Sequence, residues 1–266
     1  MLASLSGQKG AQGKMSVGKI LKNVEIAREI YFMRLERAET LPCWPGQFIH
    51  IQIPGRREML LRRPISVNNA GDRWLELVYQ VAGEGTRELS QLPAGTGLDY
   101  VGPVGRGFSL PDGAKDVWLV GGGAGIAPLK FAAAYFKGVE FTAFLGYKSV
   151  ECAYQTRDFE KLCSEVLPAC EDGALGYCGY IADVVEQELR TRRPDFILAC
   201  GPTPMLAALQ RIAHGVRGQI SLEQRMGCGV GACRACACKT AAEGAAVYAR
   251  VCVDGPVLDL AEVVFE

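Results

Sequence analysis

The hydrophobic pattern of this 266-residue chain changes near Lys115, and this change limits the folds open to it. Before Lys115, short apolar runs with strand-like alternation are separated by Pro- and Gly-containing turns, which is typical of a small antiparallel barrel. The expected strands are 26–36, 47–53 and 74–81, and the expected turns are 41–46, 53–58 and 68–73. After Lys115, buried strands alternate with helices, which indicates a parallel α/β sheet.

The second half of the chain continues this alternation up to Gln219 and then becomes rich in Gly and Cys. We expect strands at 117–120, 139–147, 166–170 and 195–199, helices through Phe136 and at 156–166, 182–192 and 205–213, and a final strand within 257–265. The predicted fold class is a multi-domain chain. It has an antiparallel β-barrel over 15–112, an α/β parallel-sheet domain over 113–218 and a small module over 219–266. Residues 1–14 lack any period and are expected to be a disordered extension.

Charge and hydropathy exclude several classes of function. Lys and Arg number 29, as do Asp and Glu, so the net charge is zero, which argues against broad nucleic-acid or acidic-membrane binding. The most apolar stretch, 116–136, contains Lys130, Pro128 and four glycines and is not a membrane span. The N-terminus has no apolar signal region, so we expect a cytoplasmic protein.

Five of the eleven cysteines fall in the last 39 residues. Cys228-x4-Cys233-x2-Cys236, followed by Cys252, is the plant-type spacing of a [2Fe–2S] cluster. Glycines in this loop allow it to curl around a cluster and bring backbone N–H groups to the sulfurs. These four cysteines are the predicted metal ligands.

Two other interpretations of the cysteines stay open. Structural zinc also takes four cysteines, although zinc ribbons usually show two separated Cys-x2-Cys pairs. The thiols could also simply be buried. Alternation places Cys238 behind the loop, so it is left out of the ligand set. The scattered cysteines from Cys43 to Cys200 are expected to be core residues.

A glycine-rich loop between a strand and a helix suggests a phosphate cradle. The loop contains Gly121, Gly122, Gly123 and Gly125, and Pro128 lies in the first turn of the expected helix. Its spacing differs from G-x-G-x-x-G, so we expect an exchanging pyridine nucleotide rather than a tightly held one. Cys200-Gly201-Pro202 follows another strand, at the sheet edge where ligands bind, or forms only a turn there.

Several segments together carry a family resemblance. Arg63-Pro64-Ile65-Ser66 resembles the Arg-x-Tyr-Ser/Thr flavin motif of the ferredoxin–NADP reductase superfamily, and Gly85-Thr86 and 102–105 resemble later barrel segments of that superfamily. The cysteine module that follows these domains limits the resemblance to one family within the superfamily. The chain resembles the family of electron-transfer subunits of B-type, NAD-dependent dihydroorotate dehydrogenases from about Val17 to Glu266.

The resemblance implies an FAD site in the barrel. Arg63 would pair with a phosphate, beside Pro64 and Ile65, and Ser66 would lie near the flavin N5. Backbone groups of Val78, Tyr79 and Gln80 would line the flavin, and Gly85 and Thr86 would hold the pyrophosphate by backbone N–H and hydroxyl. Because Ile65 stands where many reductases have an aromatic residue, Tyr79 is a candidate to stack on the ring.

The resemblance also implies an NAD site on the glycine loop. Gly121 to Gly125 would receive the pyrophosphate, and Cys200 would lie near the nicotinamide. The choice between NAD and NADP rests on the segment after the second strand of the sheet. Lys148 and Ser149 could hold a 2′-phosphate, whereas Glu151 would repel it. The family comparison favours NAD.

The implied function is electron transfer in pyrimidine biosynthesis. An FMN-containing catalytic subunit would oxidise dihydroorotate, and electrons would pass through the [2Fe–2S] cluster and FAD to NAD⁺, in a heterotetramer with two copies of each subunit. No side chain is assigned as a catalytic acid or base, and His50 and His214 receive no role. The alternatives are a reductase subunit for a hydrogenase, sulfite reductase or transhydrogenase, a self-contained diaphorase, and a zinc-stabilised binding module.

Overall fold

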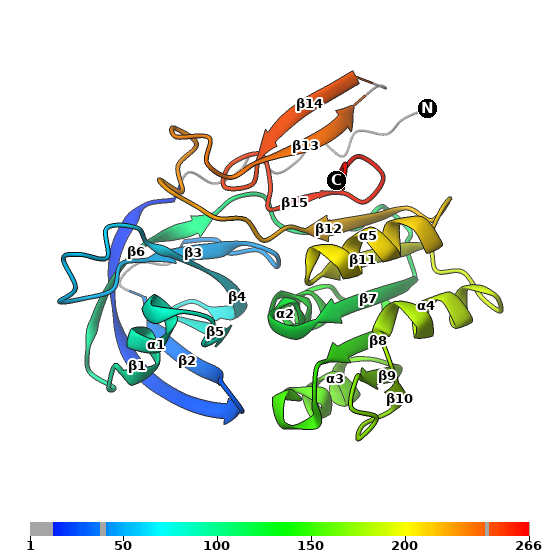
Figure 1. The fold of residues 1–266 in the computed structure, drawn as a ribbon, viewed down its shortest axis with the longest axis horizontal. Coiled ribbons are helices and arrows are strands. Elements are labelled where there is room, and N and C mark those ends of the chain that lie inside the picture. Colours follow the sequence, from blue (N-terminus) through cyan, green and yellow to red (C-terminus); the bar gives the residue numbers. More distant parts are fainter. Residues whose placement is uncertain (1–12, 38–40, 243–244, 266) are drawn as a thin grey trace.

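The computed structural model describes residues 13–37, 41–242 and 245–265 (Figure 1). In this part of the chain, six antiparallel strands close into a barrel in the order β1-β2-β5-β4-β3-β6. They are β1 (Met15–Ala27), β2 (Ile30–Glu36), β3 (Phe48–Ile51), β4 (Arg63–Gly71), β5 (Trp74–Gln80) and β6 (Gly97–Val104). A short helix, α1 (Glu84–Gln91), lies between β5 and β6. The predicted antiparallel barrel is confirmed.

The barrel forms because alternate strand residues are apolar and point inward. Ile20, Met33, Ile49 and Leu77 are fully buried in one barrel core. The expected single strand at 26–36 is wrong, because the chain turns at Glu29, whose φ is +58°. β1 and β2 therefore form a hairpin, with Ala27 paired to Ile30.

Residues 1–12 of the expected N-terminal extension lie outside the described residues. The last two residues of that extension, Gly13 and Lys14, run beside β6. The Gly102 N–H donates to the Lys14 carbonyl oxygen at 3.1 Å. A Cβ on Gly13 would lie 2.7 Å from Val104 Cγ2, so this short segment packs against the barrel.

The second body is a seven-stranded sheet in the order β10-β9-β8-β7-β11-β12-β15 within the described residues, parallel except for β15. Its strands are β7 (Asp116–Gly122), β8 (Glu140–Tyr147), β9 (Glu165–Cys170), β10 (Tyr177–Cys178), β11 (Phe196–Cys200), β12 (Gly218–Ser221) and β15 (Val257–Asp259). Its helices are α2 (Ile126–Tyr135), α3 (Thr156–Leu162), α4 (Ile181–Leu189) and α5 (Thr203–Ile212). Two 3₁₀ turns, η1 (Gly123–Gly125) and η2 (Val150–Cys152), precede α2 and α3. The predicted α/β sheet is confirmed.

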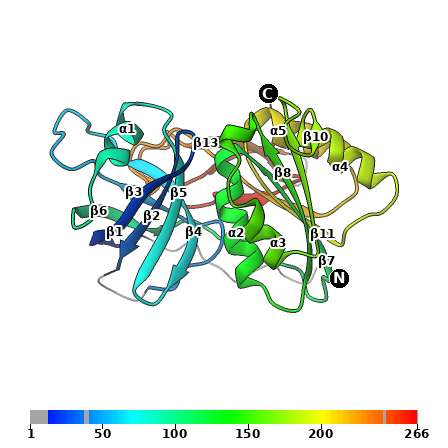
Figure 2. The same cartoon turned by 90° about the horizontal axis from the view of Figure 1, so that it is seen from below.

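Helices cover both faces of this sheet. Along β7, Val117 and Leu119 share a core cluster with residues of α2 and α3, whereas Trp118 and Val120 share another with residues of α4 and α5. Helix α2 also lies between the sheet and β4 of the barrel (Figure 2). Its Phe131 is buried in the barrel core, so α2 joins the two bodies.

The cysteine-bearing end of the chain is attached to the sheet rather than separate from it. β13 (Ala237–Ala242) and β14 (Ala245–Arg250) form a hairpin, and β15 then pairs antiparallel with β12. β12 itself crosses the boundary expected between residues 218 and 219. The final strand is shorter than expected, because only Val257–Asp259 of 257–265 is extended in a ladder.

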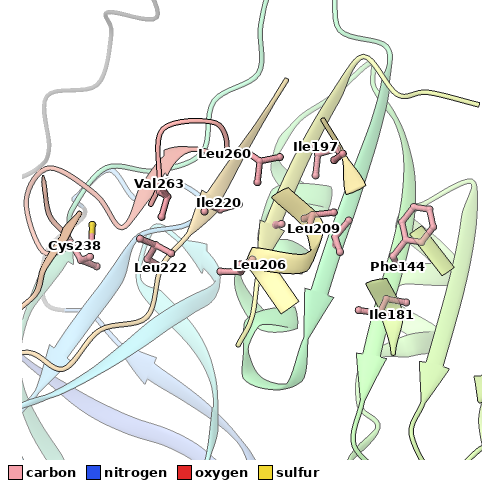
Figure 3. Close-up of a cluster of buried hydrophobic side chains, with 14 of the residues drawn as sticks. Phe144, Ile181, Ile197, Leu206, Leu209, Ile220, Leu222, Cys238, Leu260 and Val263 are labelled. Carbon is pink, nitrogen blue, oxygen red and sulfur yellow. The ribbon is translucent and has the colours of Figure 1, made fainter. Parts of the chain in front are cut away.

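A cluster of buried hydrophobic side chains joins the cysteine-bearing end of the chain to the sheet and its helices (Figure 3). Leu222, Cys238 and Val263 gather on one side of the cluster, and Leu206 and Leu209 of α5 lie in its middle. Cys238 lies in this core, as expected from alternation, and its thiol is 3.5 Å from the Ala249 carbonyl oxygen that accepts its hydrogen bond. In the described ranges, no helix is both long and apolar enough to cross a bilayer.

Candidate functional site

A cavity of about 950 Å³ opens between the barrel and the sheet. Such a volume suits a large organic cofactor. Most of the residues expected at the flavin site line it: Arg63, Pro64, Ile65, Ser66, Val78, Tyr79, Gln80 and Thr86. Strands β4 and β5 and the start of α1 bring these residues together because they are neighbours in the barrel wall. Ala124 of the glycine loop also lines the cavity, so the two expected ligand sites adjoin.

Arg63 lies over the first turn of α1, where Gly85 makes room for it. A Cβ on Gly85 would lie 2.1 Å from Arg63 Nε, so this position excludes every side chain while Arg63 keeps its place. The first turn of a helix carries free N–H groups and the positive end of the helix dipole. Together with the guanidinium they form a site that fits the pyrophosphate of FAD.

Thr86 has a different role from the one expected. Its hydroxyl accepts hydrogen bonds from the Ala82 and Gly83 N–H groups, at 2.9 and 3.1 Å, and donates to the Gly83 carbonyl oxygen at 3.0 Å. The hydroxyl is therefore occupied in closing the turn before α1. It holds the helix start in place, and the expectation that it binds pyrophosphate is not supported.

The Tyr79 side chain makes its contacts inside the barrel. Its ring is only 2% exposed and stacks on Tyr31, with 5.9 Å between ring centroids. Its hydroxyl donates to Asn23 Oδ1 at 2.9 Å, and burial raises its pKa. Stacking of this ring on a flavin is therefore not supported, and only the Tyr79 backbone remains for a ligand.

One wall of the cavity, the segment that leads from the sheet to the cysteine loop, was not predicted from the sequence. The segment from Ser221, the last residue of β12, to Met226 lines it throughout. Two residues after Met226 the chain reaches Cys228, so the cavity wall leads directly into the cysteine loop. The signal available in the sequence was the position of this segment after a buried parallel strand, the edge at which α/β sheets bind ligands.

Three of the four glycines in the loop after β7 serve packing. A Cβ on Gly125 would lie 2.3 Å from the Cys200 carbonyl oxygen, and one on Gly122 would lie 2.6 Å from Met205 Sδ. A Cβ on Gly121 would meet Ile126 at 2.9 Å. Only Gly123, with φ +53°, faces open space. The open part of the nucleotide cradle is therefore the short turn at Gly123.

Cys200 is fully buried at the end of β11. Burial raises the pKa of its thiol, and the nearby Glu223 carboxylate adds to this rise. Glu223 itself is an exposed residue that lines the cavity. Cys200 thus lies behind the glycine loop, near the cavity and without solvent contact, as an uncharged thiol.

The segment after β8 is tied to the barrel. Arg28 donates to Glu151 Oε2 at 2.5 Å, so the negative charge that would repel a 2′-phosphate is paired. Lys148 is exposed beside it. Asp172 accepts hydrogen bonds from the Val150 and Ala174 N–H groups, both at 3.0 Å, as expected for a turn residue.

The four cysteines expected to bind the cluster fall into two pairs. The Cys228 N–H points to Cys233 Sγ, and the Cys233 and Val230 N–H groups point to Cys228 Sγ, each at 3.4 Å. Cys236 and Cys252 are only 3% and 1% exposed, and each thiol lies close enough to act on the other. Burial opposes ionisation of Cys228, but the backbone donors prevail and lower its pKa to about 6.

Thiols in two close pairs suit a binuclear cluster, in which each iron takes two cysteines, better than a single zinc ion, which takes all four. Among the described residues, no three His, Cys, Asp or Glu side chains are placed to share one metal ion. Backbone N–H groups directed at sulfur stabilise negative charge on it. The donor set and its hydrogen bonds therefore fit the [2Fe–2S] interpretation.

His50, which received no role from the sequence, lies against this loop. A Cβ on Gly229, whose φ is +69°, would lie 2.4 Å from His50 Nδ1. His50 is fully buried, and burial lowers its pKa to about 4. No motif surrounds His50 in the sequence, so only the fold reveals this contact.

Comparisons with known proteins agree with the geometry. Residues 223–264 match the model of the iron-sulfur cluster binding domain of dihydroorotate dehydrogenase B. The chain is 42% identical over 249 residues to the dihydroorotate dehydrogenase B (NAD(+)) electron transfer subunit of Caldanaerobacter subterraneus subsp. tengcongensis, covering 93% of this chain and 97% of that one. The same subunit of Shouchella clausii is 38% identical, covering 95% and 98%.

Solved structures show the same architecture. An NADH-dependent reduced ferredoxin–NADP oxidoreductase superposes with a TM-score of 0.82 at 30% identity, covering 92% of this chain and 89% of that one. A ferredoxin–NADP⁺ reductase from Neisseria gonorrhoeae with bound FAD and NADP has a TM-score of 0.61 at 20% identity, covering 75% and 90%, and supports the fold alone. With the identity to full-length relatives, these likenesses establish that the chain belongs to the family of dihydroorotate dehydrogenase B (NAD(+)) electron transfer subunits.

Proposed function

We propose that this chain takes electrons from an FMN-containing dihydroorotate dehydrogenase subunit and delivers them to NAD⁺ through its own cluster and FAD. The observation that carries this proposal is the continuous segment from Ser221 to Cys228. Its first part lines the cavity at the barrel, and its end begins the cysteine loop. A flavin in the cavity and a cluster in the loop would thus be held by one short stretch of backbone.

The cavity residues have distinct parts in binding FAD. Arg63 and the first turn of α1 bind the pyrophosphate, with Gly85 as the position that admits the guanidinium. Ser66 and the backbone of Val78, Tyr79 and Gln80 orient the ring, beside Pro64 and Ile65. When bound, FAD exchanges either one or two electrons and so connects a one-electron centre with a hydride carrier.

Cys228 and Cys233 bind one iron of the cluster, and Cys236 and Cys252 bind the other. The backbone N–H groups of Val230 and Cys233 hold negative charge on the Cys228 sulfur. When bound, a [2Fe–2S] cluster transfers single electrons. Burial of Cys236 and Cys252 keeps water from that side of the site.

The glycine loop binds the dinucleotide through the open turn at Gly123, while Gly121, Gly122 and Gly125 keep the loop close to the sheet. Cys200, at the end of β11, would lie near the nicotinamide. Arg28 neutralises Glu151, so the local charge does not by itself reject the 2′-phosphate of NADP. We therefore assign NAD rather than NADP from family membership. The domain assignment is FAD for 15–112, NAD for 113–218 and the cluster for 219–266.

The partner and its stoichiometry are tested by anaerobic affinity purification from the native host. We expect a cytoplasmic heterotetramer, two copies of this chain with two FMN-bearing subunits, that oxidises dihydroorotate with NAD⁺. The same chain alone should reduce artificial acceptors with NADH. A preparation that carries FAD but lacks this activity would refute the nucleotide site. A co-purifying partner without FMN would refute the proposed pairing.

A second candidate is supported by the likeness to the ferredoxin–NADP oxidoreductase at a TM-score of 0.82. In that case the chain would serve a transhydrogenase-type complex with the same cofactors. The purification separates the two functions, because this alternative predicts a partner with several iron–sulfur clusters and no turnover of dihydroorotate.

A further inference from the structure

His50 is an exception in the wall of the barrel. It lies in β3, where its neighbours Ile49 and Ile51 are apolar, and all three residues are fully buried. Across the ladders it pairs with Pro64 of the flavin motif on one side and with Val101 of β6 on the other. Neither of its ring nitrogens has a hydrogen-bond partner among the residues that the structure describes.

A buried imidazole without partners is costly, because its N–H and its lone pair have both lost water. An apolar side chain would fill this position at no such cost, as Ile49 and Ile51 do beside it. The side chain therefore indicates a partner that the described part of the chain does not itself supply.

The groups around the His50 ring indicate where its hydrogen-bond acceptor can lie. The charged groups that act on His50 are those of Arg62 and Arg63, and a guanidinium offers donors only. The N–H of a neutral imidazole needs an acceptor, so these two side chains cannot supply it. The Arg62 backbone also acts on the ring, but it does not lie in hydrogen-bonding geometry with either ring nitrogen. The ring also meets Gly229, the residue that follows Cys228 in the cysteine loop, through its Nδ1 edge.

We propose that His50 is a positioning residue of the iron–sulfur centre, supporting the loop at Gly229 and donating its ring N–H to a sulfur atom of the bound cluster or of Cys228. This inference rests on the proposed cluster site. It adds a side-chain donor to the backbone donors of that loop. It also links the strand pair that carries the flavin motif to the loop that carries the cluster.

A hydrogen bond to sulfur has a known electronic consequence. It stabilises the additional negative charge of the reduced cluster and so raises the reduction potential. Removal of the imidazole should therefore shift the potential of the cluster to more negative values without removing any iron ligand.

The direct test uses the unaltered protein, labelled with ¹⁵N-histidine and studied by pulsed EPR after reduction. The chain has only two histidines, and the second, His214, is exposed after α5. We expect a ¹⁵N hyperfine coupling on the cluster signal that persists in His214→Gln and disappears in His50→Phe. A cluster signal without histidine coupling in the unaltered protein would overturn the proposal. Absence of any cluster signal would instead refute the cluster site itself.

A second readout is the reduction potential of the cluster in His50→Phe, at iron and FAD contents equal to those of the unaltered protein. We expect a shift to more negative potential, with His214→Gln unchanged. An unchanged potential in a fully loaded His50→Phe protein would contradict the proposed hydrogen bond. The labelling experiment decides the question if the variant fails to fold.

Discussion

The cysteines of the loop at 228–252 and those elsewhere in the chain are the same residue type in two different environments. In the loop, thiols lie in pairs and backbone N–H groups point at the Cys228 sulfur. In the rest of the chain, Cys43 and Cys163 are partly buried against the core, and desolvation raises the pKa of each to about 12. Burial alone does not separate the two sets, because it also raises the pKa of Cys252, an expected ligand, to about 12. What distinguishes the loop is the pairing of its thiols and the N–H donors directed at the Cys228 sulfur.

The largest expected effect is on Cys228. Cys228→Ala removes one of the paired sulfurs and should abolish the cluster signal and electron transfer to the partner. NADH should still reduce the retained FAD, because the cavity at the barrel does not use this thiol. The measurement is iron content together with visible absorption, with Cys178→Ala as the matched control. Full iron content in Cys228→Ala would show that this cysteine is no ligand.

A second prediction concerns how readily the loop cysteine Cys228 and the cysteines outside the loop are alkylated in the metal-free protein. The pKa of Cys228 is lowered to about 6, so its reactive thiolate forms as the pH rises through that value. Iodoacetamide should label Cys228 readily at pH 7, while Cys43 and Cys163 stay largely unlabelled until far higher pH. Peptide mass spectrometry across a pH series measures this difference. Equal labelling of the three thiols at pH 7 would contradict it.

A moderate effect is expected for Cys238, which is close to the ligands in sequence and packs in the core with Leu222 and Val263. Cys238→Ala should retain the cluster and lower the free energy of unfolding by about 1 kcal/mol, the usual size for a small buried deletion. Iron analysis and chemical denaturation under anaerobic conditions test both parts. Loss of iron in this variant would place Cys238 among the ligands.

The smallest effect is expected at Cys178, which is exposed in the short edge strand β10. Cys178→Ser should leave cluster content and NADH oxidation unchanged and alter the free energy of unfolding by less than about 0.5 kcal/mol. Thermal denaturation and an artificial-acceptor assay provide the check. A marked loss of either property would assign this thiol a role that its surroundings do not indicate.

The sequence predicted the barrel, the parallel sheet and the cysteine loop because each depends on local periodicity or spacing. It failed at one local turn and where contacts join distant segments. The turn at Glu29 lies within an apolar run that reads as one strand, and β15 joins the sheet only through its pairing with β12.

In the candidate site, too, residues within a local motif could be predicted, and contacts between distant segments could not. Arg63 was found from its motif, whereas the contact between His50 and Gly229 depends on how the barrel meets the loop. Tyr79 was expected on the flavin because it is aromatic, but its partners Tyr31 and Asn23 are set by the barrel. Such choices follow from tertiary packing, which no local pattern in the sequence encodes.

The most direct test of the account is an anaerobic NADH titration of the isolated chain, followed by visible absorption and EPR. The account predicts that NADH bleaches the flavin and that the EPR signal of a reduced cluster then appears, with two irons for each FAD. A colourless protein that contains zinc, or a flavin that NADH reduces while the oxidised cluster remains unchanged, would contradict an electron path from the cavity to the cysteine loop.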